Sequence, residues 1–233
     1  MLLEGGKLIE EAMQADYPLE AVWFTAEFLG ETPELVQRLT RAQPRIMRRI
    51  SAREMRRISS LETAPGIVAV APEPEFQRCK PGDQVLLIVA LALVQDPGNL
   101  GGVIRTADFF GVDELWLGEG SADPYNPKTI RGGMGALFRM PVFRLKNLKE
   151  EISAFRKAGA EVIAAVAHSD RAGVEMPDRG TRLLLIGGES RGLTDEELAL
   201  ADRQVCIPGA GRSESLNLAV AAGILIHAAR AKR

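Results

Sequence analysis

Three short stretches of this 233-residue chain combine glycine with polar side chains directly after an apolar run. The first, residues 95–106, follows the apolar run Val85–Val94 and contains Asn99 and Arg105. A junction between a strand and a helix is where open α/β sheets bind ligands. The stretch has neither Gly-x-Gly-x-x-Gly nor a phosphate-loop Lys-Ser/Thr pair, which argues against dinucleotide binding and nucleotide hydrolysis. The alternatives are that Asn99 caps the helix and that Arg105 is an exposed helix residue.

The second stretch, residues 186–193, places Glu189 among Gly187, Gly188 and Gly192 at the end of another apolar run. Glycine lets the backbone approach a ligand closely, and a carboxylate accepts hydrogen bonds from it. The stretch therefore predicts a ligand contact at Glu189. The alternative is a tight turn with an acidic residue on the surface.

The third stretch, residues 207–217, is a loop with a proline and two glycines, and a helix follows it. Proline and glycine permit a tight, irregular backbone close to a ligand. A hydroxyl of Ser213 or Ser215 can cap the helix. One helix face carries small residues at Ala219, Ala222 and Gly223, so another segment can pack very close to it. The alternative is an ordinary loop and C-terminal helix.

Strands and helices that position these stretches alternate from residue 84 onward. The run Val85–Val94 is typical of a strand buried on both faces of a parallel sheet. Further strands are predicted at 115–117, 141–145, 162–166, 183–186 and 205–207, and helices at 100–110, 127–138, 148–158 and 194–201. The alternation predicts a three-layer α/β domain over residues 84–233.

Residues 1–71 predict a separate small α/β unit. Its strands are predicted at 19–25 and 66–71, and its helices around residues 8–13, from Thr32-Pro33-Glu34 and from the capping box Ser51–Glu54. Residues 72–83 are rich in proline and have no apolar period, which predicts a linker between the two units.

Arginine is concentrated in the first unit. Residues 1–37 hold eight acidic residues and one lysine, whereas residues 38–58 hold eight arginines and one acidic residue, Glu54. The arginines are Arg38, Arg41, Arg45, Arg48, Arg49, Arg53, Arg56 and Arg57. Arginine binds phosphate with two donors and stacks on bases, so this segment predicts a contact with a nucleic-acid phosphate backbone. The alternative is a solvated helix face.

The remaining composition narrows the class of protein. The two cysteines, Cys79 and Cys206, form no Cys-x-x-Cys pair, and the only histidines are His168 and His227. We therefore expect no disulfide framework and no metal site. The chain starts without a signal-peptide pattern, and its longest apolar run is too short to span a bilayer. These features predict a cytoplasmic protein that does not enter a membrane.

Taken in order, the three stretches resemble the SpoU (TrmH-type) family of S-adenosylmethionine-dependent RNA ribose 2′-O-methyltransferases, which belongs to the SPOUT superfamily. The matching residues are Asn99-x-Gly101-x-x-x-Arg105-Thr106, then Gly187-x-Glu189-x-x-Gly192, then Ile207-Pro208 with Ser215-Leu216-Asn217 and Ala221-x-Gly223-Ile224. Asp123–Lys128 with Arg131 and Gly135-Ala136 also look like the family. Ser190 and Gly133 depart from it, because glycine and serine respectively are common there.

The resemblance implies a parallel sheet with a C-terminal deep trefoil knot over residues 84–233, preceded by an L30e-like RNA-binding domain in residues 1–71. It implies S-adenosylmethionine as cofactor and a homodimer formed through the C-terminal domain. Carried over by motif position, the cofactor contacts are Gly187, Gly188, Ile207, Gly211 and Leu216, and the reaction centre is Asn99, Arg105, Glu189, Ser215 and Asn217. The expected RNA contacts are Arg41, Arg45, Arg48, Arg49 and Arg53, with Lys128 and Arg131 in the second domain.

Within the family that the chain resembles, a two-domain layout favours ribosomal RNA, specifically 23S RNA, as the substrate. Two alternatives stay open within the same fold: a transfer-RNA 2′-O-methyltransferase and a non-catalytic RNA-binding protein. A third is a small-molecule or nucleotide-binding α/β enzyme, which the arginine-rich segment disfavours.

Overall fold

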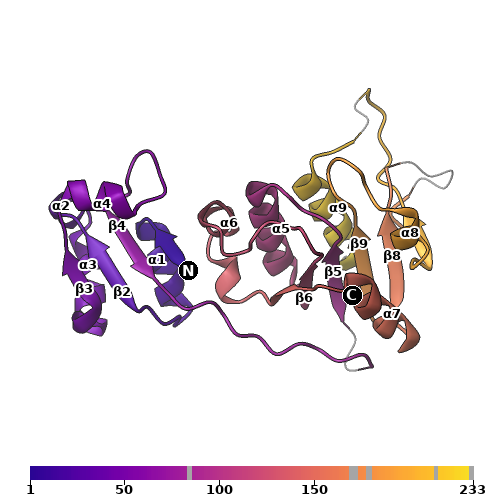
Figure 1. Ribbon diagram of the computed structural model, residues 1–233, viewed down its shortest axis with the longest axis horizontal. Helices are drawn as coiled ribbons and strands as arrows, with labels where there is room; N and C mark the ends of the chain where they lie inside the picture. Colours follow the sequence, from indigo (N-terminus) through magenta and orange to yellow (C-terminus); the bar gives the residue numbers. More distant parts are fainter. Residues whose placement is uncertain (83–85, 168–172, 177–179, 213–214, 231–233) are drawn as a thin grey trace.

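The structure is a computed structural model that describes residues 1–82, 86–167, 173–176, 180–212 and 215–230. Figure 1 shows a small α/β domain at the amino-terminal end and a larger one at the carboxy-terminal end, joined by an extended segment. Ser213 and His168, which the sequence analysis singled out, lie outside the described residues.

The amino-terminal domain has a four-stranded mixed sheet. Its strands are β1 (Leu2–Glu4), β2 (Ala21–Phe24), β3 (Met47–Arg49) and β4 (Ile67–Val70), in the order β1-β4-β2-β3. Its helices are α1 (Gly6–Gln14), α2 (Ala26–Glu31), α3 (Pro33–Ala42) and α4 (Ala52–Ile58). The capping box at Ser51 is confirmed. Strands β1 and β3 and helix α2 were not predicted, because strands of three residues and a six-residue helix carry too little periodic signal.

The carboxy-terminal domain has a six-stranded sheet whose paired strands are all parallel. Its strands are β5 (Leu87–Leu91), β6 (Glu114–Leu117), β7 (Val142–Arg144), β8 (Glu161–Ala165), β9 (Arg182–Ile186) and β10 (Arg203–Val205). Their order is β10-β8-β9-β5-β6-β7. Its helices are α5 (Pro97–Phe110), α6 (Pro127–Gly133), α7 (Leu148–Lys157), α8 (Asp195–Leu198) and α9 (Leu218–Arg230).

The three-layer prediction for this domain is confirmed by how β5 is buried. Leu87, Val89 and Leu91 share one hydrophobic cluster with α5 and α9, whereas Ile88 and Ala90 share another with α7. Side chains alternate across a strand, so apolar residues on both faces mean that helices cover both faces of the sheet.

The predicted helix 127–138 is wrong in its second half. Helix α6 ends at Gly133, because Met134 and Gly135 adopt positive φ angles of 47° and 83°. A short 3-10 turn, Ala136–Phe138, follows. The turn brings Gly135 against α1 of the other domain, where an added Cβ would lie 2.7 Å from Cβ of Glu11. The predicted helix 194–201 is also shorter than expected and covers only Asp195–Leu198, although its capping box at Thr194 is confirmed.

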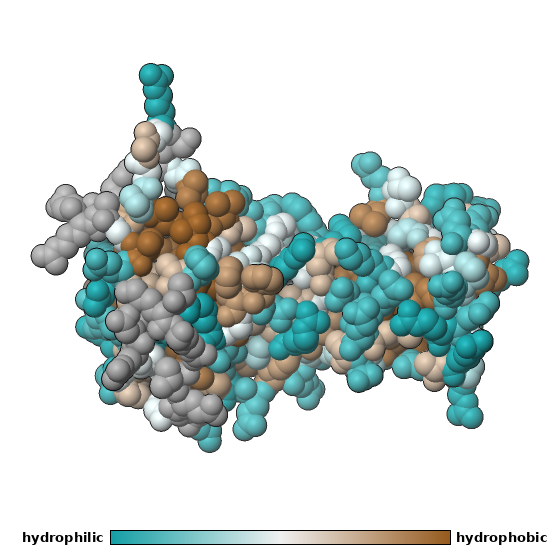
Figure 2. All heavy atoms as spheres, turned by 180° about the vertical axis from the view of Figure 1, so that it is seen from behind, coloured by the Kyte–Doolittle hydropathy of each residue, from teal (hydrophilic) through white to brown (hydrophobic). Residues whose placement is uncertain are grey.

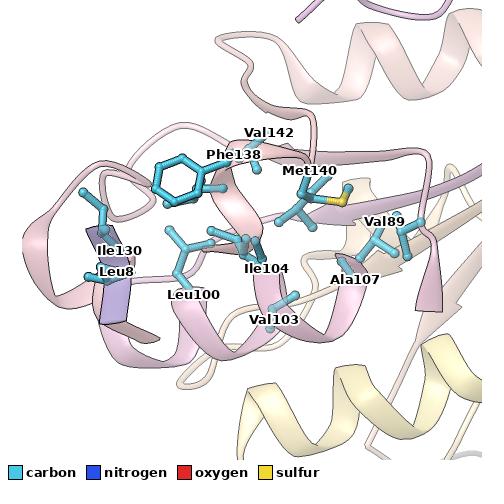
Figure 3. Close-up of a cluster of buried hydrophobic side chains, with 14 of the residues drawn as sticks. Leu8, Val89, Leu100, Val103, Ile104, Ala107, Ile130, Phe138, Met140 and Val142 are labelled. Carbon is cyan, nitrogen blue, oxygen red and sulfur yellow. The ribbon is translucent and has the colours of Figure 1, made fainter. Parts of the chain in front are cut away.

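The two domains share one continuous hydrophobic cluster. In Figure 3, Leu8 of α1 lies beside Ile130 of α6 and Leu100 of α5. The connecting segment is anchored on both sides. The Tyr17 hydroxyl donates to the Pro72 carbonyl over 3.1 Å, and the Arg78 guanidinium lies 5.2 Å from the ring centroid of Trp116. The domains therefore touch through packed side chains as well as through the chain that joins them.

Two further predictions concern the carboxy-terminal domain and the whole chain. The trefoil knot stays a prediction, because the segment that would thread it includes residues 213–214, outside the described part of the chain. Within the described residues, no helix combines the length and the apolar character needed to cross a bilayer.

Candidate active site

Three polar side chains predicted to share a reaction centre meet at one edge of the parallel sheet. Asn99 lies in the first turn of α5, which follows β5, and Glu189 follows the neighbouring strand β9. Asn217 directly precedes α9. The carboxyl ends of parallel strands face the same edge, which is where open α/β sheets place their ligand sites.

Hydrogen bonds connect the three side chains in a fixed order. Asn217 Oδ1 accepts from the backbone N–H groups of Ala219 (2.9 Å) and Val220 (3.3 Å). Asn217 Nδ2 therefore points away from the helix and donates to Asn99 Oδ1 over 2.9 Å. Asn99 Nδ2 in turn donates to Glu189 Oε1. Because the N–H groups of Ala219 and Val220 can only donate, they fix the orientation of the Asn217 amide, and Asn217 Nδ2 in turn fixes that of Asn99.

This arrangement excludes Ser215 as the predicted cap of α9 and excludes the alternative that Asn99 caps α5. The cap of α9 is Asn217, rather than Ser215. The cap of α5 is Asp96, whose carboxylate accepts from the Asn99 N–H over 2.8 Å, so Asn99 does not cap its helix. The Asp96-Pro97 pair carried this signal, since an N-cap residue before a proline at the first helical position is a helix-start signature.

Lys128, predicted to contact RNA, lies beside Asp96 at the start of α5. Its Nζ is 2.7 Å from Asp96 Oδ2. The hydrogen bond from Lys128, together with that from the Asn99 N–H, lowers the pKa of Asp96. The Lys128 side chain remains 56% exposed, so it also faces solvent next to the reaction centre.

The predicted cofactor residues belong to two loops at the same sheet edge. Gly187 is buried, and a Cβ there would collide with the backbone of Gly192, while Gly188 forms an antiparallel bridge with Gly192. Ile207 is half-buried, whereas Gly211, Ser215 and Leu216 are exposed. Added Cβ atoms at Gly209 and Gly211 would meet nothing within 4 Å, so the backbone of this loop is open to a ligand.

Helices α5 and α9 pack side by side and point the same way. Asn99 contacts Asn217, a Cβ at Gly102 would lie 3.1 Å from Cβ of Ala219, and a Cβ at Gly223 would lie 3.6 Å from Thr106. The close packing predicted for the small face of α9 is therefore confirmed. Because the two helix starts coincide, Asn99 and Asn217 are held within hydrogen-bond distance.

Arg105 lies away from the Asn99–Asn217–Glu189 cluster. It is exposed and lines a separate cavity of about 510 Å³ between the two domains. On an α-helix, six residues correspond to a rise of about 9 Å and a turn to a different face. The structure thus brings together Asn99, Glu189 and Asn217, and places Arg105 further along α5.

Arg131, also predicted to contact RNA, lies in the domain interface. Its Nη1 is 2.9 Å from Glu4 Oε2, and the Glu4 side chain is only 1% exposed. Burial opposes ionisation of Glu4, but hydrogen bonds from Ser60 and Ser59 and the charge of Arg131 outweigh it, so the pKa of Glu4 is lowered. No local signal in the sequence marks this pair, because Glu4 and Arg131 are 127 residues apart.

The arginine-rich segment spans α3, β3 and α4. The predicted RNA contacts Arg41, Arg45, Arg48, Arg49 and Arg53 are all exposed. Arg48 donates to two backbone carbonyls of its own turn, at Arg45 and Met47. Arg38 pairs with Glu10 at 3.6 Å. The segment thus presents several guanidinium groups to solvent on the amino-terminal domain.

Comparison with known proteins agrees with this architecture. The SpoU rRNA Methylase family model matches residues 86–227, and the model for RNA 2′-O ribose methyltransferase substrate binding matches residues 2–77. The 23S rRNA (guanosine(2553)-2′-O)-methyltransferase RlmP of Bacillus subtilis is 38% identical over 73% of this chain and 66% of its own length. An uncharacterized tRNA/rRNA methyltransferase of Synechocystis is 33% identical over 99% of this chain and 83% of its own length.

Solved structures are similar over the whole chain. The SpoU methyltransferase AviRb from Streptomyces viridochromogenes, in complex with AdoMet, has a TM-score of 0.84 at 27% identity, covering 99% of this chain and 89% of AviRb. An AdoMet-bound rRNA methyltransferase from Sinorhizobium meliloti has a TM-score of 0.79 at 29% identity, and the match covers 99% of this chain and 86% of the Sinorhizobium protein. Fold and site together define an RNA 2′-O ribose methyltransferase with its own substrate-binding domain. The chain belongs to the SpoU rRNA methylase family.

Proposed function

We propose that this protein transfers a methyl group from S-adenosylmethionine to a ribose 2′-hydroxyl of ribosomal RNA, specifically 23S RNA. The observation that carries the proposal is the hydrogen-bonded series Asn217–Asn99–Glu189, which joins three loops at the ligand-binding edge of the sheet. RlmP, a 23S rRNA 2′-O-methyltransferase by name, supports the choice of RNA.

The loops at this edge have the chemistry that S-adenosylmethionine requires. Ile207 and Leu216 offer apolar surface for an uncharged adenine ring, and the open backbone at Gly209 and Gly211 offers N–H and C=O groups. Gly187 and Gly188 keep the adjoining loop tight. The bound cofactor supplies a methyl group already activated by its sulfonium, so the protein contributes chiefly by positioning.

Different side chains position the two reactants, the target ribose and the cofactor. Asn99 and Asn217 have fixed amide orientations, so with Ser215 they hold the ribose hydroxyl and the methionine end of the cofactor. Glu189 anchors this series and places negative charge near the cationic sulfur. The sequence analysis placed Arg105 in the reaction centre, but it lies further along α5 in a separate cavity, so its role is to orient a backbone phosphate beside the target ribose. A guanidinium keeps its proton at neutral pH, which makes it a poor base.

The RNA is delivered by the amino-terminal domain. We divide the chain into an RNA-binding domain (1–71), a linker (72–83) and a catalytic domain (84–233). The exposed arginines of α3, β3 and α4 bind the phosphate backbone, and Lys128 extends this surface beside the reaction centre. Arg131 reaches RNA only indirectly, by holding the two domains together. We infer that the enzyme acts in the cytoplasm, as the sequence analysis predicts.

The active form is a homodimer that pairs through the outer face of α9. Val220 and Ile224 are spaced four residues apart on this face and are 52% and 38% exposed. Figure 2 shows a cluster of hydrophobic residues on the surface of the carboxy-terminal domain. Exposed apolar surface of this kind marks an interaction site in soluble proteins.

Two other functions share this fold: methylation of transfer RNA and RNA binding without catalysis. The series Asn217–Asn99–Glu189 argues against the second, because a binding module has no need for an ordered polar cluster at the cofactor edge. The test is incubation with unmethylated total RNA and radiolabelled S-adenosylmethionine, followed by mapping of ribose methylation. Label in 23S RNA supports the proposal, label in transfer RNA alone shifts it to the alternative, and no label in any RNA overturns it.

A further inference from the structure

A cavity of about 510 Å³ lies between the two domains, away from the cluster at the sheet edge. Lys7 of α1 forms part of one side, and Arg105 and Phe109 of α5 form part of the other. The cavity therefore exists only when both domains are in place. The contact between Glu4 and Arg131, which holds the domains together, is three residues from Lys7 along the chain.

Helix geometry explains why Arg105 and Phe109 border this space. Residues 101, 105 and 109 are spaced four apart and lie on one side of α5. Gly101 packs against α6, where an added Cβ would lie 2.9 Å from Cα of Gly132. Helix α6 ends one residue later, at Gly133. Arg105 lies further along this side of α5 and extends beyond α6. Phe109 lies one turn later and further round the helix, at the rim of the cavity, where its ring contacts Phe110, which in turn contacts His227 of α9.

The charged residues that line the cavity are three cations, Lys7, Arg105 and Arg139, and two carboxylates, Glu11 and Asp108. Arg139 is paired with Asp108 at 2.8 Å, and this hydrogen bond together with the charges of Asp108 and Glu11 raises the pKa of Arg139, so both carboxylates act on Arg139. Lys7 and Arg105 take part in no ion pair within the described ranges of the chain. Phe109 is 81% exposed, the highest value among the large hydrophobic residues that the structure leaves at the surface. An exposed aromatic ring beside two free cations is the combination with which proteins bind single-stranded nucleic acid.

We propose that this interdomain cavity binds a nucleotide that flanks the target ribose in single-stranded RNA. The base stacks on the Phe109 ring, and the phosphate is held between Lys7 and Arg105. Stacking tolerates any base, since every base has a π-face, so the subsite contributes affinity and register more than sequence preference. This inference rests on the proposed function, and it adds a second contact from α1 that fixes which ribose reaches Asn99 and Asn217.

The full-length protein carrying Phe109→Leu, Phe109→Trp or Lys7→Gln tests the proposal, with Lys157→Gln as the control. Lys157 is exposed at the end of α7, far from the cavity. The probe is unmethylated total ribosomal RNA, and the readouts are kcat, KM and the salt dependence of binding. Phe109→Leu keeps an apolar side chain and loses the aromatic face. We expect it to raise KM by about 5- to 150-fold with kcat unchanged, and we expect Phe109→Trp to retain the wild-type KM.

Loss of the phosphate contact at Lys7 should change the salt dependence of RNA binding. Lys7→Gln should reduce the slope of log K against log[salt] by about 0.7, the value for one phosphate contact in single-stranded nucleic acid, and Lys157→Gln should leave it unchanged. Wild-type KM in Phe109→Leu, or an unchanged slope in Lys7→Gln, overturns the subsite. Conversion of a wild-type dimer to a monomer by Phe109→Leu also overturns it, because Phe109 would then face a second copy. If the wild-type protein transfers no methyl group to RNA, the proposed function fails. The salt dependence of RNA binding in Lys7→Gln then still tests whether the cavity binds a phosphate.

Discussion

Removal of the Arg131 guanidinium should destabilise the protein by loosening the contact between its domains. In Arg131→Ala, the buried carboxylate of Glu4 loses the donor that lies 2.9 Å from its Oε2. Three other donors remain: the Ser59 hydroxyl at 2.8 Å, the Ser60 N–H at 2.8 Å and the Ser60 hydroxyl at 2.5 Å. The carboxylate therefore stays solvated by the protein in large part.

The loss of stability in Arg131→Ala depends on the hydrogen bonds that the Glu4 carboxylate keeps. Breaking a fully buried ion pair from one side costs about 3–5 kcal/mol, whereas a single hydrogen bond to a charged group contributes about 1.5–3 kcal/mol. Because Glu4 keeps three donors and the Arg131 side chain is 31% exposed, the lower range applies. We expect Arg131→Ala to lower the free energy of unfolding by about 2 kcal/mol. In a chain of this length each kcal/mol lowers Tm by about 2–4 °C.

Urea unfolding followed by circular dichroism measures this loss, with RNA affinity measured on the same samples. Arg38→Ala is the matched control, because its ion pair with Glu10 is exposed at 53% and 40% and should be worth about 0–1 kcal/mol. An unchanged unfolding free energy in Arg131→Ala, together with weakened RNA binding, would refute the interface role and restore the RNA contact predicted from the sequence. A double-mutant cycle with Glu4→Gln isolates the coupling between the two side chains.

Three further predictions follow from the same contacts. Asn217→Ser keeps a side-chain oxygen to cap α9 but loses the donor to Asn99, so we expect an almost unchanged Tm and a large loss of methyl transfer; equal loss of both would contradict the proposed role. Gly101→Ala would place a Cβ 2.6 Å from the Thr129 carbonyl oxygen and should cost about 1–3 kcal/mol in urea unfolding, whereas Gly30→Ala, with nothing within 4 Å, should be neutral or stabilising. The pKa of Glu4 is lowered from its ordinary value of 4.5, so its ionised form stabilises the fold above that pH and this contribution is lost as pH falls through the folded pKa. Stability measured from neutral to acidic pH should therefore fall more steeply in the wild type than in Glu4→Gln, and parallel curves would exclude the linkage.

Local signals in the sequence were sufficient for most elements of the larger domain. The continuous apolar run at β5 predicted a strand buried on both faces, and Thr194 and Ser51 with their glutamates marked the starts of two helices. Each signal depends on residues within one turn or one strand, so it survives without knowledge of the rest of the chain. The break in α6 at Met134 was missed, because the positive φ angles there serve a contact with α1.

The sequence by itself determined the alternation of strands and helices, the three glycine-bearing loops and the family to which their motifs belong. Tertiary structure decided which polar residues act together. Asn99 and Asn217 are 118 residues apart and meet because α5 and α9 pack side by side, and the pairing of β5 with β9 brings Glu189 to the same edge. Arg131 resembles an RNA contact in its motif, yet it lies against Glu4, because the partner of a charged side chain depends on which surfaces the fold brings into contact.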